Sequence, residues 1–219
     1  ALALAEFDAH RLVFVDGRFA PALSDVGTLP AGVRLASLAE VLNSEPALLE
    51  ARLTGGERLA FPALNTAFFD DGAFVSVAKG VCVEKPVHVL FLSTGGAAPL
   101  MWHGRVLVSV EAGSKLTLIE EYAGAGPGTY FANMVTDLNL GENASFEHVK
   151  VQHEGAQALH VATLRARQER HSRFTAHSVA KAGVVMLTES LAQALAPAVT
   201  VNAIAPGTVL MPEGASEDA

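Results

Sequence analysis

The stretch GVCVEKPVHVLFL (Gly80–Leu92) and the later stretch GSKLTLIEEY (Gly113–Tyr122) contain the pattern that decides the fold. In each, turn residues precede a short run rich in Val and Leu that alternates as a strand does. No helical period interrupts such runs, so a parallel sheet made of β–α–β units is not expected. A coiled β-solenoid and an antiparallel sandwich remain. Short strands with Gly or Asn at the corners favour the solenoid, although no strict repeat is visible.

Eight segments between residues 74 and 164 fit this strand pattern, with turn signals between them. The predicted strands are Phe74–Val77, Val81–Val83, Val87–Leu92, Val106–Val110, Leu116–Glu120, Met134–Leu140, Phe146–Val151 and Leu159–Leu164. The predicted turns are Asp71-Gly72, Lys79-Gly80, Ala112-Gly113 and Gly141-Glu142-Asn143.

The first sixty residues are mixed in character. An apolar segment, Leu12–Val15, runs into a turn at Asp16-Gly17. Helices are predicted at Leu35–Leu42 and from Pro46 to Leu53, the second closed by Gly55-Gly56. These residues are expected to form a helical cap or arm beside the β region.

The last forty residues change pattern again. From Val179 to Ala196, apolar side chains recur at roughly helical spacing until Pro197 ends the run. A strand-like segment, Val199–Ile204, follows, with a turn at Pro206-Gly207. The apolar stripe of this helix could cover the end of a solenoid.

Composition excludes several functional classes. The chain has 219 residues, and its net charge of -8 argues against binding to nucleic-acid phosphates. Cys82 is the only cysteine, so there is no intrachain disulfide and no all-thiolate cluster site, and a reducing cytoplasm is expected. No apolar run approaches the ~18 residues of a membrane span. The start at Ala1 without Met suggests a fragment or a processed product.

Three collinear stretches resemble the SufD-type iron–sulfur cluster assembly scaffolds. They are RLVFVDGRFAPALS (Arg11–Ser24), the residues from FPALNTAFFDDG at Phe61 to Leu92, and the residues from EEYAGAGPGTYF at Glu120 to Ser178. The resemblance implies a right-handed parallel β-helix flanked by helical segments, working beside SufB and the ATPase SufC. It also implies that an iron–sulfur cluster is held only together with partners. The family's C-terminal ATPase-docking part is missing here, so SufC docking is in doubt.

The tail from Val179 to Gly214 is similar instead to the later part of short-chain dehydrogenases. The strings HSVAKAGVVMLTESLAQALAP and VTVNAIAPGTVLMPEG carry this resemblance. Lys181 matches the lysine that holds the cofactor ribose in that family, but His177 occupies the place of the catalytic tyrosine. We therefore interpret the chain as a chimera with a junction near His177-Ser178.

No catalytic or cofactor-binding residue is predicted. The Gly-rich strings Thr94–Pro99 and Gly124–Gly128 lack the spacing of a dinucleotide-binding turn and are interpreted as loops. An NAD(P)-dependent short-chain oxidoreductase remnant, without activity, is the alternative to a scaffold. Saturable binding of NADPH by this chain would favour the oxidoreductase alternative.

Any metal site is unknown from the sequence, although histidines crowd one region. They are His148, His153, His160, His171 and His177. Their spacing matches no tight metal motif, so each is interpreted as solvent-facing or hydrogen-bonded, and His148 as part of a solvated or interface face. Cys82, between two valines, is predicted to pack in the core. The charged run from Arg165 to Arg173 is interpreted as a solvated face.

These observations lead to one interpretation of the whole chain. Residues 1–60 form a helical or mixed segment, residues 61–178 a SufD-like β-helix, and residues 179–219 the dehydrogenase-like tail. The chain is expected to be a non-catalytic, truncated, cytoplasmic scaffold. Its expected partners are SufB-like and SufC-like proteins or a second copy, with neither nucleic acid nor a membrane involved.

Overall fold

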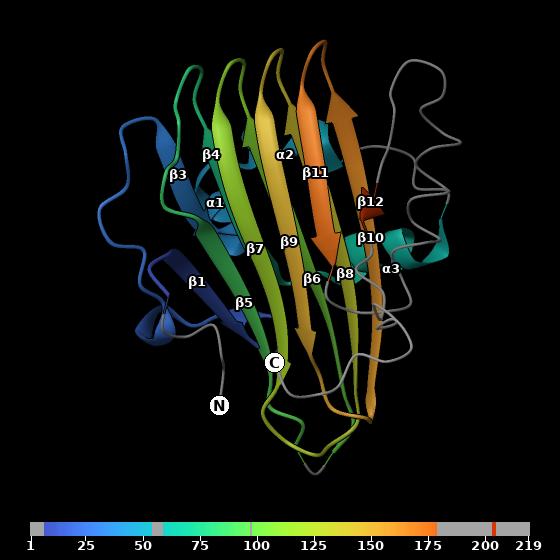
Figure 1. Cartoon of the computed structure of the whole chain (residues 1–219). Coiled ribbons are helices and arrows are strands. Elements are labelled where there is room, and N and C mark those ends of the chain that lie inside the picture. Colours follow the sequence, from blue (N-terminus) through green and yellow to red (C-terminus); the bar gives the residue numbers. More distant parts are fainter. Residues whose placement is uncertain (1–6, 54–58, 97, 179–202, 205–219) are drawn as a thin grey trace, which may run out of the picture.

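The computed structural model describes residues 7–53, 59–96, 98–178 and 203–204, and its fold is a parallel β-helix of about four turns (Figure 1). The chain passes alternately between two sheets, and each strand pairs in parallel with its equivalent in the next coil. Among the described strands, only β1–β2 and β3–β4 pair antiparallel. The predicted parallel β-helix is therefore confirmed, and the antiparallel sandwich is wrong.

The two sheets contain seven and five strands. The seven-stranded sheet, nearest the viewer in Figure 1, comprises in spatial order β12 (Ala203–Ile204), β11 (Arg173–Ser178), β9 (Ser145–His153), β7 (Lys115–Gly124), β5 (Val87–Ser93), β1 (His10–Val15) and β2 (Arg18–Phe19). The five-stranded sheet comprises β10 (Ala158–Gln168), β8 (Tyr130–Leu140), β6 (Leu100–Val110), β4 (Asp71–Val77) and β3 (Val33–Ser37). The helices are the short 3-10 turn η1 (Pro21–Leu23), α1 (Leu38–Ser44), α2 (Pro46–Leu53) and α3 (Ala60–Phe68).

A stack of turns sets the length of each coil. Gly80, Gly113, Asn143 and His171 occupy the same place in successive turns, all with left-handed φ of 74°, 70°, 59° and 57°. The N–H groups of the first three donate to carbonyls of the following turn at 2.9 to 3.1 Å: Gly80 to Ala112, Gly113 to Glu142 and Asn143 to Arg170. One coil thus takes about 30 residues. Glycine adopts this conformation without steric cost, which explains its use at the first two corners.

The interior between the two sheets forms the main core. Inward-facing side chains such as Val75, Val89, Phe91, Val106 and Leu118 are almost completely buried. Burial of each large one contributes about 1.5–3 kcal/mol. The alternation of strand side chains places them there.

The N-terminal residues contribute strands to both sheets. β1 extends the seven-stranded sheet by pairing in parallel with β5, and β3 pairs with β4 at the edge of the other sheet. Helices α1 and α2 cover the outer side of β4 and β6, where Leu38 and Leu49 pack with Phe74 and Leu107. The apolar segment Leu12–Val15 lies within β1, and the predicted helix from Pro46 is confirmed.

The predicted helix Leu35–Leu42 begins too early. Leu35 lies opposite Val75 in the β3–β4 ladder, and the helix begins at Leu38. Ser37 is the N-cap: its hydroxyl accepts from the N–H of Glu40 at 3.3 Å and donates to Asp71 at 2.7 Å. This cap explains why the chain changes from strand to helix at that residue.

Two further predictions about the β region need correction. Val81–Val83 is not a strand, because it makes only an isolated bridge between Cys82 and Lys115. The residues from Phe61 to Phe68, predicted within the β-helix, belong to helix α3. Its buried Asn65 amide donates to the carbonyls of Gly104 and Asn133, on β6 and β8, at 2.8 and 2.9 Å. These bonds attach α3 to two coils.

Most of the tail lies outside the described residues, including the predicted helix Val179–Ala196. Of the predicted strand Val199–Ile204, the last two residues form β12, which pairs in parallel with Ala176 and His177 of β11. No helix among the described residues is long and apolar enough to cross a membrane.

Candidate functional site

A polar cluster lies inside the solenoid, where an apolar interior would be expected. The inward-facing side chains of β7 are Leu116, Leu118, Glu120 and Tyr122, and Glu120 and Tyr122 are each only 1% exposed. On β9, Lys150 and Gln152 occupy the equivalent positions in the next coil. The strand alternation that buries leucines therefore also carries these charged groups into the interior.

Glu120 is the centre of the cluster. His148 Nε2 lies 3.0 Å from Oε2 of Glu120, the Thr136 hydroxyl donates to the same oxygen at 3.1 Å, and the Tyr122 hydroxyl donates to Oε1. Burial alone would raise the pKa of Glu120. The hydrogen bond and charge of His148, the charge of Lys150 and the Tyr122 hydroxyl outweigh burial and lower this pKa to about 2. Glu120 is therefore a carboxylate at neutral pH.

A second chain of contacts runs from Lys150 toward the loop that follows β9. The Lys150 ammonium lies 3.4 Å from Nε2 of His160, and Nδ1 of His160 lies 2.8 Å from Oε2 of Glu154. Tyr130 donates to Oε1 of Glu154 at 3.1 Å. The Lys150 ammonium also lies 4.7 Å from the centroid of the Tyr122 ring, so a cation–π contact joins the two chains of contacts.

The interior position changes the acidity of these groups. Burial lowers the pKa of Lys150, an effect that the charges of Glu120 and Glu154 oppose. Burial raises the pKa of Tyr122 well above its ordinary range, and burial together with Glu154 raises that of Tyr130 to about 12. Burial would raise the pKa of Glu154, but hydrogen bonds from His160, Gln152 and Tyr130 and the charge of His160 lower it. Both tyrosines therefore stay protonated at neutral pH while both carboxylates are charged.

Of the five histidines singled out in the sequence, two lie in the interior and three lie at the surface. His148 and His160 both lie in the interior cluster. His148 is 4% exposed and contacts Glu120, so the prediction that it is hydrogen-bonded is confirmed, and the prediction that it lies on a solvated face is wrong. The reason is that His148 shares the inward side of β9 with Phe146. The other three lie at the surface: His153 is half-exposed 3.5 Å from Glu121, His177 lies 3.5 Å from Glu147, and His171 occupies a turn.

The prediction that Cys82 packs in the core is wrong, because its side chain is exposed. Val83 is buried and Val81 packs against the core. With both neighbours turned inward, the residue between them faces outward.

The Gly-rich strings and the charged run differ in how well they match the predictions. The described residues of the Gly-rich strings Thr94–Pro99 and Gly124–Gly128 lie in loops between strands, except Gly124, which ends β7. No group of His, Cys, Asp and Glu in the described part of the chain could hold a metal ion. Lys181 lies outside the described residues. In the charged run, Arg165 donates to Asp137 at 2.6 Å, so it is not simply solvated.

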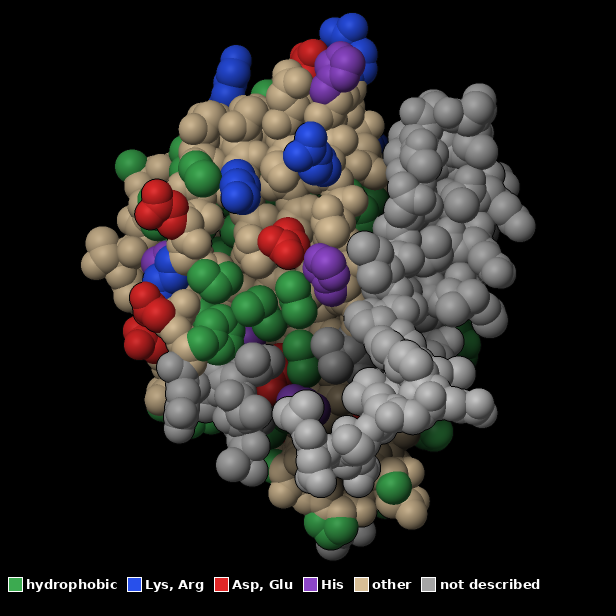
Figure 2. Space-filling view, viewed as in Figure 1, with side chains coloured by type: hydrophobic (Ala, Val, Ile, Leu, Met, Phe, Trp, Pro, Cys, Tyr) green, Lys and Arg blue, Asp and Glu red, His purple; other side chains and the backbone are tan. Residues whose placement is uncertain are grey.

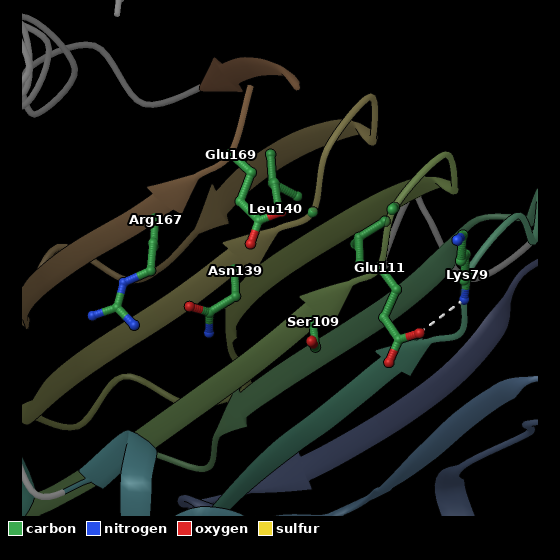
Figure 3. A pocket seen from close by; sticks show the side chains of 10 residues that line it. Lys79, Ser109, Glu111, Asn139, Leu140, Arg167 and Glu169 are labelled. Carbon is green, nitrogen blue, oxygen red and sulfur yellow. Dashed lines mark hydrogen bonds between the residues drawn. The ribbon is translucent and has the colours of Figure 1, made fainter. Parts of the chain in front are cut away.

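A shallow groove of about 440 Å³ lies at the turn end of the five-stranded sheet (Figure 3). The charged residues that line it are Lys79, Glu111, Arg167 and Glu169, beside Asn139. Two cations and two carboxylates give no single sign of charge to select a ligand. The interior cluster is therefore the better candidate site.

Sequence reasoning missed Glu120, Tyr122, Lys150 and Glu154 as members of one site. The available signal was the pair Glu120-Glu121 inside the otherwise apolar strand LTLIEEY. Which of the two carboxylates turns inward cannot be known before the strand register is known.

Two family models match the chain in collinear order. The SufBD protein N-terminal region matches residues 3–89, and the SUF system FeS cluster assembly SufBD core domain matches residues 91–203. The protein is thus a solenoid of the type found in iron–sulfur cluster assembly systems. The chain belongs to the SufBD family.

Curated relatives give the same assignment. The chain is 32% identical over 182 residues to the iron-sulfur cluster assembly SufBD family protein slr0076 of Synechocystis sp., covering 78% of this chain and 40% of the relative. It is 28% identical over 164 residues to the iron-sulfur cluster assembly protein SufD of Escherichia coli, covering 74% and 36%. For the Arabidopsis thaliana protein ABCI7, chloroplastic, the identity is 25%, covering 82% and 39%. The chain spans about two fifths of the length of these relatives.

The match to the core domain also bears on the predicted junction. It continues beyond Ser178 to residue 203, so the predicted change of family at Ser178 finds no support there. The dehydrogenase-like tail stays a prediction.

Proposed function

We propose that the protein is a non-catalytic scaffold component of iron–sulfur cluster assembly, similar to SufD. One observation carries this proposal: the SufBD N-terminal and core regions match in order along a single parallel β-helix. Two relatives named for this process are 32% and 28% identical to the chain over 182 and 164 residues. The oxidoreductase alternative is not favoured.

The expected partners are a SufB-like protein and, through it, a SufC-like ATPase, and the expected compartment is the cytoplasm. Among the described strands, the eleven-residue β10 ends the five-stranded sheet. A terminal strand offers backbone N–H and C=O groups to a strand of another chain. The same edge could pair two copies of this protein. Direct SufC docking is not part of the proposal.

Co-elution tests this function. The chain is mixed at about 10 µM with a SufB-like subunit, alone and with a SufC-like ATPase, and the mass of the complex is measured by light scattering. We expect a complex with the SufB-like subunit, and anaerobic addition of iron and sulfide should produce cluster absorbance only in that complex. Absence of any complex at this concentration would contradict the proposal.

The dehydrogenase-like tail is a separate hypothesis. We expect no NAD(P)-dependent activity, because His177 stands where that family has a tyrosine and the Gly-rich strings lack the dinucleotide-binding spacing. Titration of NADPH, followed by its fluorescence, should show no saturable binding at micromolar levels. Sequencing the genomic region across Ser178 would test whether one reading frame encodes both parts.

A further inference from the structure

The charged groups inside the solenoid connect one coil to the next. Glu120 belongs to β7, His148 and Lys150 to β9, Glu154 to the loop after β9, and His160 to β10. We call these five residues the interior lock. Within it, His148 contacts Glu120 in the neighbouring coil, Lys150 contacts His160 in the other sheet, and His160 contacts Glu154 in the loop between β9 and β10.

The preceding coil is held differently. In β5, the residues opposite Glu120 and Tyr122 are Val89 and Phe91, and both are buried in the apolar core. Inside the solenoid, the contacts between β7 and β5 are therefore apolar, whereas on the outer face of the same two strands the Glu121 carboxylate lies 2.9 Å from His88. Contacts on the other side, toward β9 and β10, depend on carboxylates that must stay ionised.

We propose that the interior lock is acid-sensitive: protonation of Glu120 and Glu154 releases β9, β10 and β11 from β7 and β8, while the coils from β4 to β7 stay folded. Only protons are exchanged with solvent. The titratable groups that face the two carboxylates are Tyr122 on β7, Tyr130 on β8, His148 and Lys150 on β9, and His160 on β10. Once the carboxylates are neutral, the buried Lys150 ammonium loses the two charges that oppose its burial, and His148 and His160 lose the charged oxygens that they contact.

The direction of the pH effect follows from the carboxylates. The pKa of Glu120 is about 2 in the folded protein against an ordinary value of 4.5, and that of Glu154 is also lowered. Such groups stabilise the fold above their ordinary pKa and lose that contribution as pH falls through the folded value. Release is therefore expected between about pH 4.5 and pH 2. Each pKa unit changes the opening equilibrium about tenfold.

The chain contains separate spectroscopic reporters for the two regions. Its only two tyrosines, Tyr122 and Tyr130, donate to the two carboxylates of the lock. Its only tryptophan, Trp102, stacks on Phe91 in the preceding coil and donates to Ser93 at 3.1 Å. Second-derivative absorbance of the tyrosines and Trp fluorescence can thus be followed on the whole chain from pH 7 to pH 2. We expect the tyrosine transition at the higher pH, and coincident transitions would overturn the proposal.

Variants test the same idea at fixed pH. Glu120→Gln imitates the protonated carboxyl, so its tyrosines should be exposed at pH 7 with Trp102 fluorescence unchanged. Glu147→Gln is the matched control, because Glu147 is a half-exposed carboxylate on β9 next to His148, and it should behave as the wild type. Buried tyrosines in Glu120→Gln at pH 7 would overturn the proposal.

A second variant decides the matter if Glu120→Gln does not fold. Lys150→Met removes one of the cations that lack a counter-charge in acid. The tyrosine transition should therefore move to lower pH. A tyrosine transition that is unchanged or moves to higher pH would overturn the proposal.

Discussion

The early and late coils of this solenoid have the same backbone but different interiors. Around β1 and β5 the interior is aromatic and aliphatic: Phe14 stacks on Phe91 with ring centroids 5.0 Å apart, and Val89 is fully buried. Around β9 and β10 the equivalent positions hold Lys150, Gln152 and His160. The difference shows that parallel β-helix pairing tolerates either filling, provided that every interior charge has a partner.

The outer face of the seven-stranded sheet also contains both apolar and charged contacts. Hydrophobic side chains gather near the middle of this face in Figure 2. The outward-facing Val13, Leu90 and Ala123 form a small buried cluster of their own. On the same face, the buried carboxylate of Glu121 lies 2.9 Å from His88. Both faces of this sheet thus contain apolar contacts and contacts between carboxylates and histidines.

The largest effect is expected in the apolar coil. Phe91→Ala removes a ring that stacks on Phe14, Trp102 and Tyr122, and the cavity should lower the free energy of unfolding by about 3–5 kcal/mol. Urea denaturation at pH 7 and at pH 4 should give the same loss, because no ionisable group is removed. Leu23→Ala is the control, since Leu23 is 57% exposed and should change little. A strongly pH-dependent loss for Phe91→Ala would weaken the contrast between the coils.

Glu120→Ala should cost about 3–5 kcal/mol at pH 7, because it leaves His148 and Lys150 without their carboxylate. Unlike the loss in Phe91→Ala, this one should shrink as pH falls from about 4.5 toward the folded pKa of about 2, where the wild-type carboxyl also becomes neutral. Urea denaturation at several pH values measures the difference, with Glu147→Ala as the exposed carboxylate control. A loss that is equal at all pH values would mean that Glu120 acts through packing and not through charge.

A smaller effect is expected at the turn stack, which both regions share. Gly113→Ala should lower the free energy of unfolding by about 1–2 kcal/mol, because Gly113 has a left-handed φ of 70°. An added Cβ would meet no atom within 4 Å, so the loss should come from the backbone conformation alone. Gly96→Ala is the matched control: it also has open space but no left-handed φ, so it should be neutral or slightly stabilising. Thermal unfolding compares the two. Equal melting temperatures would show that the turn conformation is not a constraint.

The smallest effect is expected for Lys150→Met at neutral pH. Burial lowers the pKa of Lys150, so its charged form is disfavoured in the fold, and an apolar side chain of similar length should change the free energy of unfolding by no more than about 1 kcal/mol. Chemical denaturation at pH 7 measures this, with the exposed Lys115→Met as control. A loss above about 3 kcal/mol would identify Lys150 as an essential partner of Glu120.

Much of the β region could be predicted because strand and turn signals are local. Seven of the eight predicted strands lie inside observed strands, and the turns at Gly80, Gly113 and Asn143 adopt the left-handed conformation that their residue types favour. The fourth turn, at His171, was missed because its residue type gives no such signal. The repeat was also missed, since coils of slightly different length conceal the equivalence of Gly113-Ser114, Asn143-Ala144 and His171-Ser172.

The sequence by itself determined the alternation along each strand, the positions of most corners and, through its resemblance, the family. Only the tertiary structure decided which side of each strand is the inside. Alternation defines two faces but does not say which one the next coil will cover, so Cys82 was expected inside and lies outside, and His148 was expected outside and lies inside. The interior lock arises in the same way, because Glu120 meets His148 only after the parallel register places β9 beside β7.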